Sequence, residues 1–119
     1  MSNEITETIE RYFKLWREMD SGDRLRKLAE ICSEDVRYCD PGADVSGFEA
    51  LAAHIEATLA RMHGSRLIQI GSIDHHHGMA RFGWCLERVD GSHGAECIDF
   101  VELSENGKID QITGFFGPM

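Results

Sequence analysis

The carboxylate of Asp40 is the first side chain in this sequence that could do chemistry. It ends a short apolar stretch and precedes Pro41, and alternation along a strand places it on the same face as Val36 and Tyr38. A carboxylate at the inner end of a strand could serve as a general base, with Tyr38 beside it in a ligand pocket. An aspartate before proline also commonly begins a turn and bonds nearby amides. The sequence leaves both roles open for Asp40.

A second carboxylate, Asp99, lies in the segment 95–103. Alternation there places Asp99 on one face with Cys97, Val101 and Leu103. A charged carboxylate is expensive to bury, so Asp99 must be neutral, paired or beside a wet cavity. A β-bulge that reverses this face, or a buried arginine that pairs with Asp99, would give it a purely structural role.

Three consecutive histidines, His75 to His77, form the most conspicuous local motif. Neighbouring strand residues point to opposite faces, so at most His75 and His77 could converge, and no acidic residue is clearly placed to complete a metal site. We expect no metal. His76 shares its alternation with Ile68 and Ile70 and is our candidate for a polar residue of the pocket, with an exposed hairpin end as the alternative.

Helical spacing dominates the first half of the chain. The first apolar face steps by three and four residues through Ile5, Ile9, Tyr12, Trp16 and Met19. Asp20–Asp23 interrupts it, and a short second helix follows. Residues 41–47 are expected to form a loop, and a third helix over 48–62 is expected to begin after Ser46 as N-cap. Tyr12 and Trp16 are expected in the core, which is compatible with a place in a pocket wall.

The second half reads as strands. After a short strand at 36–40 in the first half, strands are expected over 66–76, 79–89, 95–103 and 108–116, separated by turn residues. Alternation places Phe82 and Trp84 on one face, and we expect both in the pocket. Helices followed by hairpin-linked strands indicate an α+β fold of one domain spanning 1–119. A sheet of this kind can curve over its helices, so we expect three N-terminal helices packed in the concave face of a strongly curved, mainly antiparallel sheet.

The order of these motifs resembles the nuclear-transport-factor-2-like (NTF2-like) superfamily, and within it the SnoaL-like and ketosteroid-isomerase-like small proteins. The resemblance covers essentially the whole chain. It rests on YFKLW in the first helix, YCDP and SG before the third helix, HHHGMARFGW across the first long hairpin, and DFVELSENGKI near the end. This fold serves several isomerase, cyclase and hydrolase chemistries as well as plain binding modules, so the fold alone does not determine the activity.

For ketosteroid isomerases, the resemblance implies three catalytic roles. The general base of the Asp-Pro motif corresponds to Asp40. The protonated aspartic acid that donates to the developing enolate lies eight residues before the glycine of the last turn, Gly107, which is Asp99. The tyrosine that shares this task corresponds to Tyr12 by context, although counting from the turn after the first helix places the family position on Leu15. Such a pair of carboxyl groups works when their environments separate their pKa values.

The composition restricts the partners. The chain has 12 basic and 21 acidic residues and a net charge of −9, so nucleic acid and anionic membrane surfaces are unsuitable partners. No signal peptide is recognisable and no apolar run approaches the ~20 residues of a membrane span, so we expect a cytoplasmic protein. The four cysteines show neither a C-x-x-C pair nor zinc spacing and are expected to be small core residues.

Two functions remain open at the level of sequence. The chain could be a cofactor-independent, isomerase- or cyclase-like enzyme that removes a proton next to a carbonyl of an apolar small molecule, with Asp40, Asp99 and Tyr12 in the catalytic roles. Alternatively, it could be a non-catalytic ligand-binding or dimerisation module. In both cases we expect a homodimer through the outer sheet face, where Ile98, Phe100 and Phe116 would supply an apolar patch.

Overall fold

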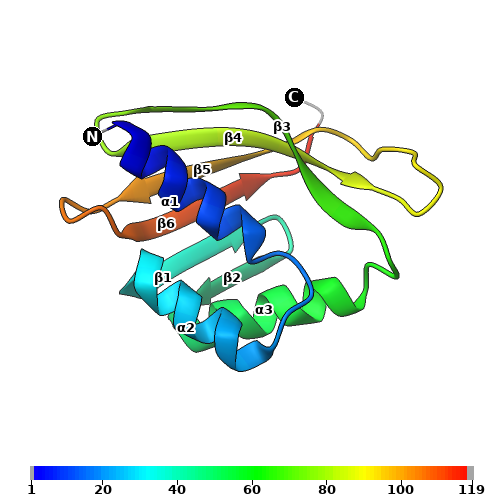
Figure 1. The fold of residues 1–119 in the computed structure, drawn as a ribbon, viewed down its shortest axis with the longest axis horizontal. Coiled ribbons are helices and arrows are strands. Elements are labelled where there is room, and N and C mark those ends of the chain that lie inside the picture. Colours follow the sequence, from blue (N-terminus) through cyan, green and yellow to red (C-terminus); the bar gives the residue numbers. More distant parts are fainter. Residues whose placement is uncertain (1, 118–119) are drawn as a thin grey trace.

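The computed structural model describes residues 2–117, and this part of the chain forms three helices and six strands (Figure 1). The elements in chain order are α1 Ser2–Lys14, α2 Ser21–Ile31, β1 Cys32–Asp40, β2 Ala43–Ser46, α3 Phe48–Ala60, β3 Arg66–His76, β4 Met79–Glu87, β5 Cys97–Leu103 and β6 Ile109–Phe115. Figure 1 shows α1 lying across the sheet, with α2 and α3 beside β1 and β2.

The six strands form a single mixed sheet in the order β2-β1-β6-β5-β4-β3. β1 pairs with β6 in parallel, and the other four neighbouring pairs are antiparallel. The parallel pair joins the helical first half to the hairpins of the second half, because β1 precedes α3 and β6 is the last strand. The expected α+β fold with a curved, mainly antiparallel sheet is confirmed.

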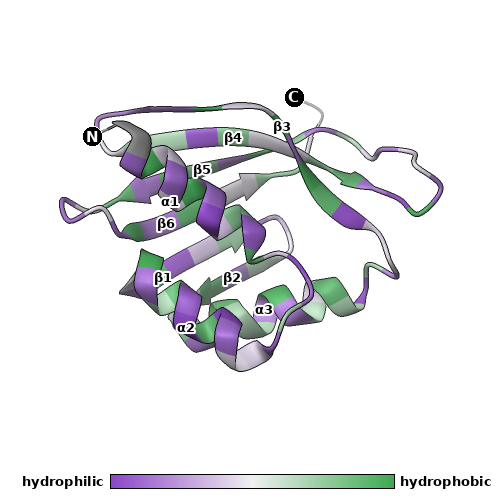
Figure 2. Cartoon of the chain, in the orientation of Figure 1, coloured by the Kyte–Doolittle hydropathy of each residue, from purple (hydrophilic) through white to green (hydrophobic). Residues whose placement is uncertain are grey.

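The core fills the space between the helices and the concave face of the sheet. Its fully buried apolar side chains come from all three helices and from four strands: Ile9, Tyr12, Leu28, Leu51, Ile55, Val36, Phe82, Val101, Ile109 and Ile112. Figure 2 shows the corresponding alternation of apolar and polar residues along the helices and strands. Burial of these side chains stabilises the fold by roughly 1.5–3 kcal/mol for each large aliphatic residue, before the entropic cost of folding.

The end of α1 is held by a buried arginine. The helix ends at Lys14, earlier than the apolar spacing predicts, and Leu15 continues in a tighter turn by donating its N–H to Tyr12 at 3.0 Å. Arg24 of α2 is 2% exposed, donates Nε to the Leu15 carbonyl at 3.1 Å and pairs with Glu56 of α3 at 3.1 Å. Arg24 therefore joins the three helices, and it is not a partner of Asp99.

The segment between Pro41 and α3 was expected to be a loop, and this prediction was wrong. Ala43–Ser46 forms the edge strand β2 against β1, supported by the Arg37–Asp44 ion pair at 3.0 Å. Ser46 therefore ends a strand, and Gly47 takes the N-cap position of α3 with a φ of 89°, which favours glycine. Four residues carry too little periodicity to reveal so short a strand.

Candidate functional site

A cavity of about 220 Å³ lies between α1, α3 and the concave face of the sheet. Aromatic and aliphatic side chains make most of its wall, and two carboxyl groups open into it. The lining residues are Phe13, Trp16, Tyr38, Asp40, Gly42, His54, Thr58, Arg61, Leu67, Trp84, Asp99 and Phe116. An apolar enclosure with a few convergent polar groups is the usual form of a small-molecule site.

Asp40 ends β1, and each of its two carboxyl oxygens accepts a hydrogen bond. Its Oδ1 accepts a hydrogen bond from the N–H of Gly42 at 2.8 Å, which closes the turn after the strand. Its Oδ2 accepts from the hydroxyl of Tyr38 at 2.6 Å and faces the cavity. Burial raises the pKa of Tyr38 above its usual range, so this hydroxyl keeps its proton and remains a donor.

His54 of α3 is a polar residue of the site that the sequence reasoning missed. Its Nε2 lies 3.7 Å from Oδ2 of Asp40, and its ring centroid lies 5.0 Å from that of Tyr38 and 5.9 Å from that of Trp16. His54 follows Leu51 by one helical step of three residues and precedes Ile55, so it borders the buried face of the helix. That spacing was the available signal.

Asp99 lies on β5, paired with Phe82 of β4 and facing the cavity. Its side chain is 6% exposed, and its Oδ1 accepts a hydrogen bond from Nε1 of Trp84 at 2.9 Å. Burial raises the pKa of Asp99 to about 6; the Trp84 hydrogen bond opposes this shift, and the negative charge of Asp40 adds to it. Asp99 therefore changes protonation near pH 6.

Gly114 of β6 keeps the two carboxyl groups close together. It pairs with Asp99 across the β5–β6 ladder. A Cβ atom at Gly114 would lie 2.9 Å from Oδ1 of Asp99 and 3.5 Å from Cβ of Asp40. A side chain at this position would therefore fill the space that lets both carboxyl groups reach one cavity. A single glycine in a strand gave no clear signal in the sequence.

Two expected site residues lie behind the cavity wall. Tyr12 and Phe82 are fully or almost fully buried, at 0% and 1% exposed, and neither lines the cavity. Phe13, the neighbour of Tyr12, packs edge-on against Phe82 with ring centroids 5.5 Å apart and itself reaches the cavity. The hydroxyl of Tyr12 has no well-formed hydrogen bond with the described residues, and burial together with the charge of Asp99 raises its pKa.

His76 lies on the other face of the sheet. Ile68 pairs with Cys85, and His76 pairs with Met79, whereas the cavity residues of the neighbouring strands are Leu67 and Trp84. His76 does share alternation with Ile68, as the sequence indicated, but that face is the convex one. The exposed His76 ring contacts His77 instead, with Nδ1 atoms 3.1 Å apart. The structure does not bring His76 to the cavity.

No three His, Cys, Asp or Glu side chains within residues 2–117 are grouped so that they could hold a metal ion. The four cysteines are unpaired. In the same part of the chain, no helix has the length and apolar character needed to cross a membrane.

The fold and the enclosed site define a protein of the NTF2-like class. More specifically, the chain belongs to the family of SnoaL-like domains, whose sequence pattern matches residues 9–112. No curated protein matches the sequence.

Solved structures agree with this assignment. A candidate isomerase of the SnoaL-like family from Agrobacterium tumefaciens strain C58 shares 31% identity over 98% of this chain and 99% of its own, with a TM-score of 0.90. A candidate SnoaL-like polyketide cyclase from Jannaschia sp. CCS1 shares the fold at 12% identity, with 95% and 85% coverage and a TM-score of 0.74. An NTF2-like protein of unknown function from Cytophaga hutchinsonii ATCC 33406 shares it at 10% identity, with 96% and 90% coverage and a TM-score of 0.70.

Proposed function

We propose that this protein is a cofactor-independent acid–base enzyme that binds an apolar, carbonyl-bearing small molecule and moves a proton next to the carbonyl. The observation that carries the proposal is that Asp40 and Asp99 line the same small cavity in different environments. The likeness to a candidate isomerase and a candidate polyketide cyclase supports the same class of reaction.

The environments suggest separate tasks for the two carboxyl groups. Asp40 accepts hydrogen bonds from Gly42 and Tyr38, and such bonds stabilise a charged carboxylate. We therefore assign Asp40 as the base. Asp99 is dry and has one donor, Trp84, so its protonated form is favoured below about pH 6. A protonated Asp99 would donate to the carbonyl oxygen as negative charge develops there. A ligand that displaces water from the cavity would raise its pKa further.

The first experiment uses 2-tetralone, a small apolar ketone, and follows the exchange of its α-protons for deuterium by NMR. We expect Asp40→Asn to slow the catalysed exchange by about 10²- to 10⁴-fold, the usual contribution of a general base. The circular dichroism spectrum should remain unchanged. Catalysed exchange at the wild-type rate in Asp40→Asn would refute the assignment of the base.

The pH dependence of the same reaction tests the role of Asp99. If Asp99 acts as the acid, kcat/KM should fall as the pH rises through about 6, because the protonated form disappears. That limb should vanish in Asp99→Asn. A rate that instead rises through the same pH would reverse the two roles. Saturable binding of 2-tetralone without any exchange would favour a non-catalytic binding protein.

We also propose that two copies associate through the convex face of the sheet. Met79, Phe100 and Phe115 on that face are 40–51% exposed, and the rings of Phe100 and Phe115 meet edge-on at 5.9 Å. Phe116, which was expected in this patch, lines the cavity instead. Exposed aromatic side chains gathered on one sheet face are typical of a protein interface.

A further inference from the structure

The charges around the cavity differ in sign between its buried interior and its exposed edge, which we call the mouth. Asp40 and Asp99 lie inside, while Arg61 lies in the cavity wall where α3 ends, at its C-cap position. Arg61 is exposed and makes no ion pair or side-chain hydrogen bond with any residue in 2–117. Arg61 therefore presents a positive charge beside the cavity, although the chain has a net charge of −9.

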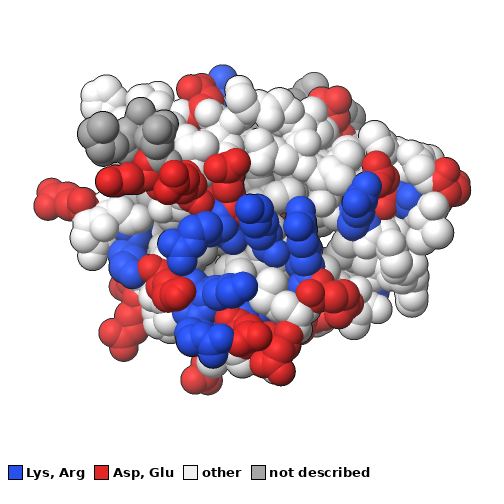
Figure 3. Space-filling model, in the orientation of Figure 1, with Lys and Arg blue, Asp and Glu red and all other residues white. Residues whose placement is uncertain are grey.

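A groove next to the cavity continues the positive region. It runs between the end of α1 and the start of β3 and shares Phe13 and Leu67 with the cavity wall. Lys14 and Arg17 line this groove, are exposed, and form no ion pair with a described residue. Figure 3 shows Lys and Arg side chains gathered on the face that carries α1 and α2.

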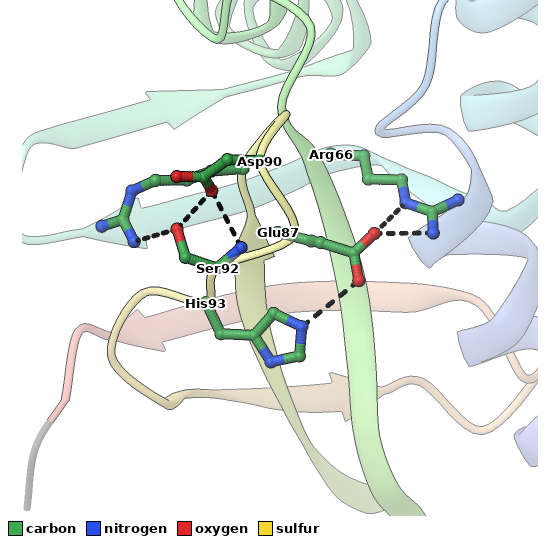
Figure 4. A network of polar contacts seen from close by, with 6 residues as sticks. Arg66, Glu87, Asp90, Ser92 and His93 are labelled. Carbon is green, nitrogen blue, oxygen red and sulfur yellow. Dashed lines mark hydrogen bonds and ion pairs between the residues drawn. The ribbon is translucent and has the colours of Figure 1, made fainter.

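Arg66 and Glu10 also line the groove but change its positive charge near the cavity little. Arg66 donates to Glu87 at 2.7 Å, and His93 approaches the second oxygen of the same carboxylate at 3.2 Å, as Figure 4 shows. Glu10 is the acidic residue of the groove and lies at the end away from the cavity along α1. Lys14, Arg17 and Arg61 are therefore the lining cations of the cavity and the groove that no described carboxylate pairs with.

We propose that the natural ligand carries an anionic group, such as a carboxylate, sulfate or phosphate, that binds at this mouth next to Arg61. The proposal rests on the proposed function, because it assumes that the uncharged carbonyl end occupies the cavity. The Asp40 carboxylate repels an anion from the interior, and Arg61 attracts it at the mouth. The two effects together orient the ligand with its carbonyl toward the carboxyl pair.

A matched pair of fluorescent probes tests this inference without any catalytic readout. 1-Anilinonaphthalene-8-sulfonate and N-phenyl-1-naphthylamine differ only by the sulfonate. We expect the anionic probe to bind more tightly in low salt, and Arg61→Gln to weaken it by roughly three- to tenfold while leaving the neutral probe unchanged, as for a partly exposed charge pair. Lys14→Gln/Arg17→Gln should act in the same direction, and 0.5 M salt should reduce the preference.

Controls separate a local effect from the total charge. Arg81→Gln removes one positive charge on the convex face, where Arg81 pairs with Asp74 at 3.3 Å, and should leave both probes unaffected. Each probe should displace the other, which places them in one site.

Equal effects of Arg61→Gln on both probes, or failure of mutual displacement, would overturn the inference and leave the proposed function intact. Tighter binding of the anionic probe without any catalysed α-proton exchange would support the anion-binding mouth and refute the proposed catalytic function. Binding of neither probe would remove the apolar site that both proposals need.

Discussion

Ionisation of the buried Asp99 makes the free energy of unfolding depend on pH. The folded chain holds the proton on Asp99 up to about pH 6, whereas an unfolded chain releases it near the ordinary value of 3.8. Between these values the folded state binds more protons, so this residue's effect on the free energy of unfolding becomes less favourable as the pH rises. Ionisation of Asp99 therefore lowers the free energy of unfolding above pH 6 by roughly 3 kcal/mol at most, relative to its value below pH 3.8.

We therefore expect Asp99→Asn to stabilise the protein at neutral pH and to reduce its activity. The amide stays neutral and can still accept the Trp84 hydrogen bond, so the unfolding free energy should rise by roughly 1–3 kcal/mol at pH 8 and little at pH 4. Urea unfolding at several pH values measures this difference. Asp110→Asn, at an exposed position of β6, is the control. A gain that is the same at pH 4 and pH 8 would contradict the titration of Asp99.

Part of this site could be predicted from single residues. Strand alternation pointed Asp40 and Asp99 inward because a carboxylate among apolar neighbours stands out from its pattern. His54 was missed because one histidine beside a helical apolar face is usually an ordinary surface residue. Gly114 was missed because its role depends on a cross-strand neighbour, and the register between two strands is a property of the folded sheet.

At the scale of elements, three strands meet where the carboxyl groups approach each other. Asp40 ends β1, Asp99 lies in β5, and β6 runs between these strands and contributes Gly114. The expected helices and long strands are present because their apolar periodicity is strong. The short strand β2 and the inward face of β3 could not be predicted without knowing which strands pair. Ile68 and Ile70 appeared to point inward, whereas Leu67 lines the cavity.

Gly114→Ala tests whether this glycine makes room for the two carboxyl groups. The added methyl group would lie 2.9 Å from Oδ1 of Asp99, so Asp99 must rotate away from Trp84 or the strands must separate. We expect a loss of about 1–3 kcal/mol in unfolding free energy, together with slower proton exchange in 2-tetralone. Gly94→Ala is the matched control, because its methyl group would lie at an ordinary 3.6 Å from Cβ of Leu86 and Gly94 does not line the cavity. Equal behaviour of the two variants would show that Gly114 is not a spacer.

At the scale of the whole molecule, the proposed dimer makes a separate prediction. A lysine in place of Phe100 puts a charge in the centre of the convex patch and should convert the dimer to a monomer, as measured by light scattering at micromolar concentration. Val89→Lys alters an apolar residue that is 77% exposed but lies in the segment after β4, and it should leave the dimer intact. A monomeric wild-type protein under these conditions would rule the interface out.

The two indole rings have a practical consequence. The sequence contains two tryptophans, Trp16 and Trp84, and both line the cavity. The tryptophan emission of the unlabelled protein therefore comes entirely from the wall of the cavity. A compound that displaces water there changes the polarity around both emitters, and the hydrogen bond from Trp84 to Asp99 links the same signal to the protonation of that carboxyl group. The protein thus contains its own optical sensor for screening unknown ligands.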